Sequence, residues 1–163
     1  MYIIVDKVHD RKYSKIVGIK RESNMKISTK GRYALRIMID LAMHLDEGPI
    51  RVKDIASRQH ISEKYLEQII ALFNKAGYVK SVRGAQGGYL LTKTPQEYTA
   101  GMILRLAEGS IAPMSCVGET PEQCDRKGAC VSALLWEKMN AAVNEVVDNT
   151  TLQDLVEWQK SLV

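Results

Sequence analysis

The sequence has no apolar run that approaches the ~20 residues of a membrane-spanning helix, and its first residues lack the apolar core of a secretory signal. It has only three cysteines, and an odd number argues against a disulfide framework. Nothing in it resembles the motif of a substrate pocket. We therefore expect a cytoplasmic protein that is not an enzyme. Its 163 residues, 45% hydrophobic and 26% charged, are typical of one globular domain, or of one domain with an arm.

Positive charge is concentrated at the N-terminus. Residues 1–24 hold six lysines and arginines against three acids, so they carry +3 of the formal net charge of +4. A basic arm of this kind can contact nucleic acid. The alternative is a disordered leader, or a start placed upstream of the native one, because a freshly patterned segment opens at Met25. We favour this alternative, a disordered leader or a non-native start, over a contact with nucleic acid.

Residues 52–77 show two short helical patterns separated by a tight turn. Apolar residues recur at helical spacing in 52–60 and in 62–77, and the second pattern has Ser62 as its expected N-cap and Gly77 as its stop. A longer helical pattern starts at Ser28, with Thr29 as the expected cap. Two helices joined by a tight turn predict a helix-turn-helix.

A hairpin is expected directly after these helices. Two β-rich runs, 78–82 and 88–92, flank a glycine-rich tip that begins with Arg83. Together the elements predict a mainly α chain with a small β wing, a winged helix-turn-helix. The hairpin could simply close the core. Its basic tip and bare glycines favour instead a wing that approaches nucleic acid closely.

The second helix of the motif is the expected recognition helix. Such a helix presents residues near its N-terminus to base edges in the major groove. Glutamine can read adenine, and glutamate can accept a hydrogen bond from the cytosine amino group. Lys75 and Lys80 add possible phosphate contacts. A solvated helix face is the alternative, but it leaves the wing unexplained. The candidate DNA-binding residues are Ser62, Lys64, Tyr65, Glu67, Gln68, Arg83 and Gly84.

Three more helices are expected in the C-terminal part of the chain. A short one covers 100–108, a long one covers 131–148, and the last covers 151–161 with Thr150 and Gln153 as a capping box. The long helix carries a wide apolar stripe, which favours packing against a second copy of the chain. This stripe contains Leu134, Leu135, Met139, Ala142, Val143 and Val146.

These patterns divide the chain into three parts. Residues 1–24 form the arm, 25–98 the winged helix-turn-helix domain, and 99–163 a cysteine loop with dimerisation helices.

All three cysteines, Cys116, Cys124 and Cys130, lie in one loop. Their gaps of seven and five residues are wider than those of structural zinc sites, and no histidine lies in or near the loop. A catalytic cysteine would need a base such as histidine. Iron–sulfur clusters accept wider and more varied spacing. A thiol redox switch stays open, because Arg126 and Lys127 could lower the pKa of a neighbouring thiol.

The helix-turn-helix, the stretch "SVRGAQGGYLL" and a C-x7-C-x5-C loop before an "LLW" helix together resemble the Rrf-two family of winged-helix regulators, and within it the iron–sulfur cluster regulators. The resemblance covers residues 25 to about 155. It implies a repressor of iron–sulfur biogenesis or iron homeostasis genes, binding palindromic promoter DNA as a homodimer. A cluster-free regulator of the same fold, sensing thiol oxidation or a partner, is the alternative.

The resemblance also assigns roles to residues. It implies base-reading positions at Lys64, Tyr65, Glu67 and Gln68, and a minor-groove position at Arg83. The three cysteines would be ligands of an iron–sulfur cluster, with [2Fe–2S] favoured over [4Fe–4S].

The fourth ligand departs from the family pattern. Where relatives carry a histidine three residues past the last cysteine this chain has Ala133, and where one relative carries an N-terminal aspartate it has Arg32. We favour Glu67, because the family's cluster loop lies near the recognition helix, often across the dimer. Glu67 bound to iron could not read cytosine, so ligation would couple cluster occupancy to DNA specificity. The alternatives are water, a small thiol, or the loop carboxylates Glu119, Glu122 and Asp125.

Overall fold

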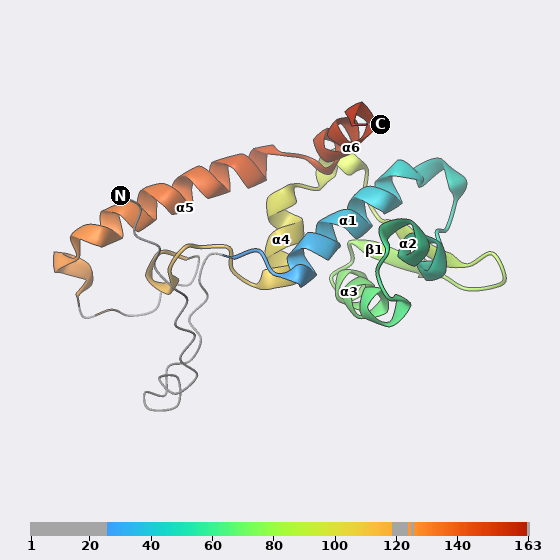
Figure 1. Ribbon diagram of the computed structural model, residues 1–163, viewed down its shortest axis with the longest axis horizontal. Coiled ribbons are helices and arrows are strands. Elements are labelled where there is room, and N and C mark those ends of the chain that lie inside the picture. The colour runs from blue at the N-terminus through green and yellow to red at the C-terminus, as the bar shows by residue number, and fades with distance from the viewer. Residues whose placement is uncertain (1–25, 119–123, 125, 163) are drawn as a thin grey trace, which may run out of the picture.

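The computed structural model describes residues 26–118, 124 and 126–162 as a helical molecule with one small hairpin (Figure 1). The mainly α class with a β wing is confirmed. Among the described residues, no helix is both long enough and apolar enough to cross a bilayer. In chain order the elements are α1 (Thr29–Met43), the 3-10 turn η2 (Leu45–Glu47), α2 (Val52–Gln59), α3 (Glu63–Lys75), β1 (Val79–Val82), β2 (Gly88–Leu91), η3 (Pro95–Glu97), α4 (Ala100–Glu108), η4 (Ser115–Val117), η5 (Lys127–Ala129), α5 (Val131–Asn149) and α6 (Leu152–Ser161).

Two expected helix caps are wrong by one residue. Ser28, and not Thr29, caps α1, because its hydroxyl accepts hydrogen bonds from the backbone N–H groups of Lys30 and Gly31. Thr151 caps α6 in a capping box with Asp154, in place of the expected Thr150 and Gln153. Adjacent hydroxyl residues are equally suited to capping by type, so only backbone geometry selects between them.

The helix-turn-helix is built on α1. The inward face of α3 is buried among residues of α1, α2 and β1, and consists of Leu66, Ile69, Ile70 and Phe73. The strands β1 and β2 pair antiparallel with Val79 opposite Leu91. An isolated bridge adds Ile50 to this sheet, since its N–H and C=O both bond to the backbone of Tyr89 at 3.0 and 2.8 Å.

Tyr98 joins the base of the wing to the rest of the core. Its side chain is fully buried, and its hydroxyl donates to the Tyr78 carbonyl at 2.7 Å. The same oxygen accepts the backbone N–H groups of Thr92 and Lys93 at 3.2 and 3.0 Å. A single phenol therefore connects both ends of the β1–β2 hairpin to the start of α4.

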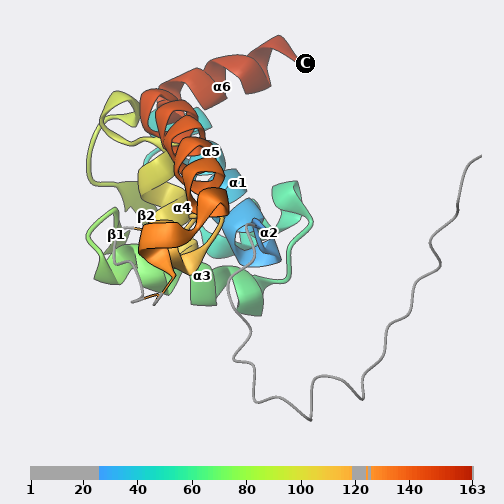
Figure 2. The ribbon, with the colours of Figure 1, turned by 90° about the vertical axis from the view of Figure 1, so that its left-hand side faces the viewer.

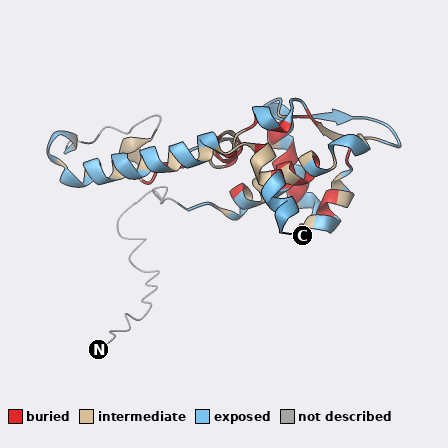
Figure 3. Ribbon diagram, turned by 90° about the horizontal axis from the view of Figure 1, so that it is seen from above, coloured by how far each residue is buried: buried red, intermediate tan, exposed pale blue. Residues whose placement is uncertain are grey.

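The core continues past residue 98. Both α4 and α6 pack on α1, and Leu152 of α6 is fully buried in the same cluster as the helix-turn-helix residues. In contrast, α5 extends away from this body and is largely exposed (Figures 1 and 3). The expected division of the chain near residue 98 stays a prediction, and the expected arm, 1–24, lies outside the described residues.

Candidate nucleic-acid interface and cysteine loop

The outward face of α3 collects most of the expected base-reading residues. Lys64, Glu67 and Gln68 are exposed and share one face, because side chains three and four residues apart are neighbours on a helix. Ser62 is the N-cap residue of α3, and its exposed side chain makes no capping hydrogen bond. The recognition-helix candidates are thus together on a solvent-facing surface near the start of α3.

Tyr65 differs from its neighbours, because it is half-buried. Its ring packs edge-on against Tyr33 of α1, with centroids 5.8 Å apart and planes at 71°. The Arg36 guanidinium carbon lies 5.5 Å from the centroid of the Tyr33 ring. Tyr65 therefore also attaches α3 to α1, a role that helical spacing alone does not reveal.

The wing lies beside α3 (Figures 1 and 2). Arg83 and Gly84 are exposed at its tip, and Gly84 has a φ of 115°, which favours glycine. The other tip glycines have reasons inside the protein. A Cβ on Gly87 would lie 2.3 Å from the Val82 carbonyl oxygen, and one on Gly88 would lie 2.4 Å from the carbonyl oxygen of Ile50.

This result narrows the interpretation of the glycine-rich tip. Gly87 permits the turn, and Gly88 permits the pairing with Ile50. Of the three glycines at the tip, only Gly84 is a position where an added Cβ would meet open space. Arg83 is joined by exposed lysines nearby in the sequence, Lys75 at the end of α3 and Lys80 in β1. The wing and α3 therefore present cationic side chains of the kind that contact phosphates.

The cysteine loop connects α4 to α5. Cys116 lies in η4 and is half-buried, Cys124 is exposed, and Cys130 occupies the N-cap position of α5. All three are free thiols. The side-chain amide of Asn140 donates to the Val117 carbonyl at 3.0 Å and so ties the first part of the loop to α5.

The start of α5 stabilises the thiolate of Cys130. Its Sγ lies 3.2 Å from Ser132 Oγ, and this hydrogen bond is the main reason that the pKa of Cys130 is lowered. The backbone N–H of Ala133 and the cation of Arg126 lower the pKa further. A thiolate is the form of cysteine that binds metals and reacts with oxidants.

The donors of the loop fit an iron–sulfur cluster by chemistry, because free thiolates are its preferred ligands. Within the residues that the structure describes, no three Cys, His, Asp or Glu side chains lie close enough to hold a metal ion. The expected loop carboxylates Glu119, Glu122 and Asp125 lie outside those residues. At the two positions where relatives carry the fourth ligand, this chain has Ala133 and Arg32. The Arg32 guanidinium donates a hydrogen bond to Thr29 Oγ1.

Glu67 and the cysteine loop lie apart in one chain. Glu67 is on α3, in the winged-helix body, whereas η5 and the start of α5 lie at the opposite end of the molecule (Figure 1). A contact between Glu67 and a cluster would therefore need the loop of a second chain.

The helix α5 is largely exposed (Figure 3), and one side of it carries an apolar surface. None of the nineteen residues of this helix is buried. Contiguous apolar surface of this kind marks an interaction site more often than chance exposure. We call it the exposed α5 face; its members are Val131, Leu134, Leu135, Met139 and Val146, which are 82%, 62%, 52%, 37% and 66% exposed.

Sequence patterns missed a polar cluster behind the helix-turn-helix. Asp40 lies inside the apolar run "IMIDLAM" of α1, yet it is only 2% exposed and bonds to Arg58 and Gln59 of α2. A carboxylate at a core-facing helical position was the available signal. Patterns also missed the contact of Glu108 with Ser28, whose N–H and hydroxyl both donate to Glu108 Oε1, at 2.9 and 2.8 Å.

A winged helix-turn-helix with a polar outward face on α3, followed by a long helix exposed along one side, defines a DNA-binding transcription regulator. The chain belongs to the Rrf2 family: the family model, described as an iron-dependent transcriptional regulator, matches residues 27–158.

Named relatives support the same class. The HTH-type transcriptional regulator CymR of Bacillus subtilis is 48% identical over 134 residues, covering 82% of this chain and 91% of CymR. The solved structure of B. subtilis CymR, described as the global cysteine regulator, matches with a TM-score of 0.70 and 46% identity over 82% of this chain and 97% of that one. The structure of T. potens IscR matches with a TM-score of 0.67 and 45% identity, and the match covers 81% of this chain and 86% of that one.

Proposed function

We propose that the protein is a homodimeric, cluster-sensing repressor that binds a palindromic promoter site in double-stranded DNA. The observation that carries the proposal is the placement of three free cysteines in one loop at the start of α5, in a chain with a complete winged helix. The likeness to a solved IscR supports it. The genes controlled would be those of iron–sulfur biogenesis or iron homeostasis.

The DNA contacts follow from the exposed residues. We expect α3 to enter the major groove, where Glu67 and Gln68 read cytosine and adenine edges and Lys64 contacts DNA beside them. Ser62 and Tyr65 flank this face, and the tip of the wing, Arg83 with Gly84, enters the minor groove. The exposed α5 face joins two chains, so that two recognition helices address the two halves of a palindrome.

In the cluster-bound form, Cys116, Cys124 and Cys130 would be the cysteine ligands and Glu67 of the partner subunit the fourth, with [2Fe–2S] favoured. A bound cluster would supply an iron whose ligation responds to iron supply and oxidants. The hydrogen bond from Ser132 favours the thiolate of Cys130 that ligation requires. A Glu67 held by iron is withdrawn from DNA, so cluster loss changes the sequence preference.

Anaerobic purification tests the cluster. The protein should be brown, with iron and acid-labile sulfide in stoichiometric amounts, and Mössbauer spectra should give the cluster type. Serine substitution of each cysteine in turn should remove the visible absorbance. A wild-type protein that stays colourless after anaerobic reconstitution would overturn cluster sensing and leave DNA binding intact.

The fourth ligand needs a separate test. Glu67→Ala should shift the cluster spectrum and speed cluster loss in air. Glu63→Ala, which removes another exposed carboxylate of α3, is the matched control and should change neither. A Glu67→Ala protein with the wild-type spectrum and stability would exclude Glu67 and return the assignment to the loop carboxylates.

A cluster-free regulator is the second candidate, and one observation favours it. The chain is 48% identical to CymR, whose solved structure is described as that of a global cysteine regulator. In that case the free thiols would respond to oxidation, or the protein would respond to a partner. An iron-free protein whose DNA affinity changes on reversible thiol oxidation, and is insensitive to iron, would support this candidate over the first.

A further inference from the structure

Asp40 is a carboxylate in the core of the DNA-binding body. Among the described residues it is the only charged side chain in the buried class, at 2% exposure. Burying a carboxylate is unfavourable unless several donors satisfy it. Apolar packing between α1 and α2 would not need such a group, so its presence calls for a role other than burial of surface.

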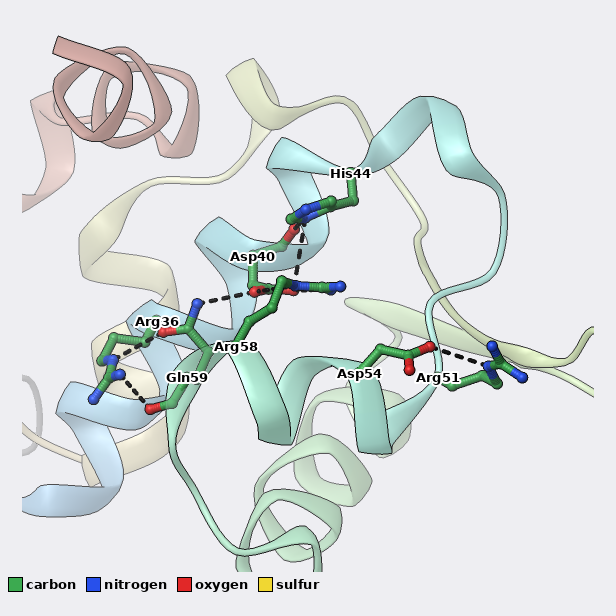
Figure 4. Close-up of polar contacts among 7 residues, drawn as sticks. All are labelled: Arg36, Asp40, His44, Arg51, Asp54, Arg58 and Gln59. Carbon is green, nitrogen blue, oxygen red and sulfur yellow. Dashed lines mark hydrogen bonds and ion pairs between the residues drawn. The ribbon is translucent and has the colours of Figure 1, made fainter. Parts of the chain in front are cut away.

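Three donors from the last turn of α2 meet this carboxylate (Figure 4). Arg58 donates two hydrogen bonds to the carboxylate, from Nε to Oδ2 at 3.0 Å and from Nη2 to Oδ1 at 2.6 Å. The Gln59 side-chain amide adds a third bond to Oδ2, at 2.9 Å. A two-point guanidinium–carboxylate contact fixes direction as well as distance, because both groups are planar.

Arg36 holds the same turn of α2 from one helical turn earlier on α1 (Figure 4). Its Nε donates to Gln59 Oε1 at 3.0 Å, and its Nη2 donates to the Gln59 carbonyl oxygen. Arg36 and Asp40 are four residues apart, so they lie on one face of α1. Tyr33, three residues before Arg36, continues this face onto α3 through its contact with Tyr65.

The last turn of α2, which Asp40 and Arg36 bind, leads directly into the recognition helix α3. Gln59 ends α2, and only His60, Ile61 and Ser62 separate it from α3. His60 is in the left-handed conformation with a φ of 53° and Ile61 is buried, so this connection is short and tightly constrained. The direction of the last turn of α2 therefore sets the direction in which α3 leaves the turn.

We propose that Asp40 is a positioning residue for DNA recognition, which through Arg58 and Gln59 holds the helix-turn-helix at the angle that presents α3 to the major groove. The inference rests on the DNA-binding function and adds a residue that does not touch DNA. Asp40 is buried and the Arg58 side chain is 34% exposed. An ion pair with a buried member often contributes little net stability relative to apolar side chains of similar size, and fixing one arrangement is its better-attested role. Replacing the pair by apolar side chains should therefore weaken sequence-specific DNA binding while the protein still folds.

The test replaces the pair by apolar side chains in the full-length protein, as the double variant Asp40→Leu with Arg58→Met. The probe is a duplex that the wild-type protein selects from a random DNA library, and a scrambled duplex of the same length reports non-specific binding. Both are measured by fluorescence anisotropy over a range of salt. We expect a folded variant whose selected-duplex affinity falls about tenfold, the scale of one base-reading contact, while scrambled-duplex affinity falls less.

The exposed pair at the start of α2, the N-cap residue Arg51 with Asp54, is the matched control (Figure 4). These side chains meet at 3.0 Å and are 49% and 37% exposed. The double variant Arg51→Met with Asp54→Leu removes the same two charges and should leave the ratio of selected to scrambled affinity unchanged. Loss of a phosphate contact would weaken both duplexes alike and lower the salt slope by about one, which does not alter that ratio.

Arg58→Lys covers the case in which the apolar variant does not fold. Lysine keeps the ionic attraction but not the two-point contact, so the affinity ratio should still fall. A folded apolar variant with the wild-type ratio, or a wild-type ratio in Arg58→Lys, would overturn the inference. An equal fall in the Arg51–Asp54 control would do the same. If the wild-type protein selects no duplex, the DNA-binding function itself fails and the inference fails with it.

Discussion

At the scale of single residues, the buried hydroxyl of Tyr98 shows how much one polar atom organises. It accepts two backbone N–H groups at the end of the hairpin and donates to the Tyr78 carbonyl. Tyr98→Phe removes these bonds with little change of shape. We expect it to lower the free energy of unfolding by about 1–2 kcal/mol in urea titrations.

The half-buried Tyr89 offers the comparison for this change. Tyr89→Phe should alter the free energy of unfolding by less than about 0.5 kcal/mol, as is usual for substitutions away from buried polar networks. Equal losses in the two variants would contradict the role given to the Tyr98 hydroxyl.

Ser132 controls the ionisation of one cysteine. Its hydroxyl is the main cause of the lowered pKa of Cys130, so Ser132→Ala should raise that pKa and reduce the thiolate fraction near neutral pH. We expect slower alkylation of Cys130 by iodoacetamide in the metal-free, reduced protein, followed by mass spectrometry. The alkylation rate of Cys124 in the same samples is the internal reference and should not change. An unchanged Cys130 rate would contradict the prediction.

At the scale of elements, an ion pair joins α5 to α4 of the body. Arg105 of α4 bonds to both carboxylate oxygens of Asp148, at 2.6 and 2.9 Å, and to Asn144. Gly101 permits this approach, because an added Cβ would lie 2.1 Å from Asp148 Oδ1. The hydrogen bonds from Arg105 lower the pKa of Asp148.

This lowered pKa predicts a pH-dependent contribution to stability. A carboxyl group with a depressed folded-state pKa stabilises the fold above its unfolded pKa of about 3.9, and the contribution is lost as the pH falls through the folded value. Asp148→Asn should therefore lower the free energy of unfolding at neutral pH. The loss should be about 1 kcal/mol or less, because the pair is partly exposed, and it should almost vanish in strong acid. Thermal unfolding of both proteins across this range is the measurement; a difference that persists in strong acid would contradict it.

At the scale of the whole molecule, the exposed α5 face predicts a dimer. Leu135→Lys places a charge in the centre of this face and should give a monomer by sedimentation at concentrations where the wild type is dimeric. Glu137→Lys, which adds the same lysine to an exposed polar position of α5, should stay dimeric. Since the proposed dimer would bind both halves of a palindromic site at once, the monomer should lose about 100-fold or more in DNA affinity. A monomeric wild type would contradict the prediction.

The same helix shows what could be predicted from local sequence. The long helix with its apolar stripe, the helix over residues 100–108 and the hairpin all follow from spacing and residue type, and the structure has them within about two residues of the expected bounds. The caps of α1 and α6 lie one residue from the expected positions, since adjacent serines and threonines are equally suited to capping and only the backbone geometry selects between them.

By itself, the sequence determined the winged-helix class, the outward residues of α3 and the gathering of all three cysteines in one loop, because period, turn residues and proximity along the chain are local properties. Only the tertiary structure decided that Gly88 leaves room for the backbone of Ile50 and that Arg58 binds the Asp40 carboxylate. It also decided that Glu67 lies apart from the cysteine loop of its own chain. These are relations between distant segments. They depend on how helices pack against one another, and no local pattern encodes that packing.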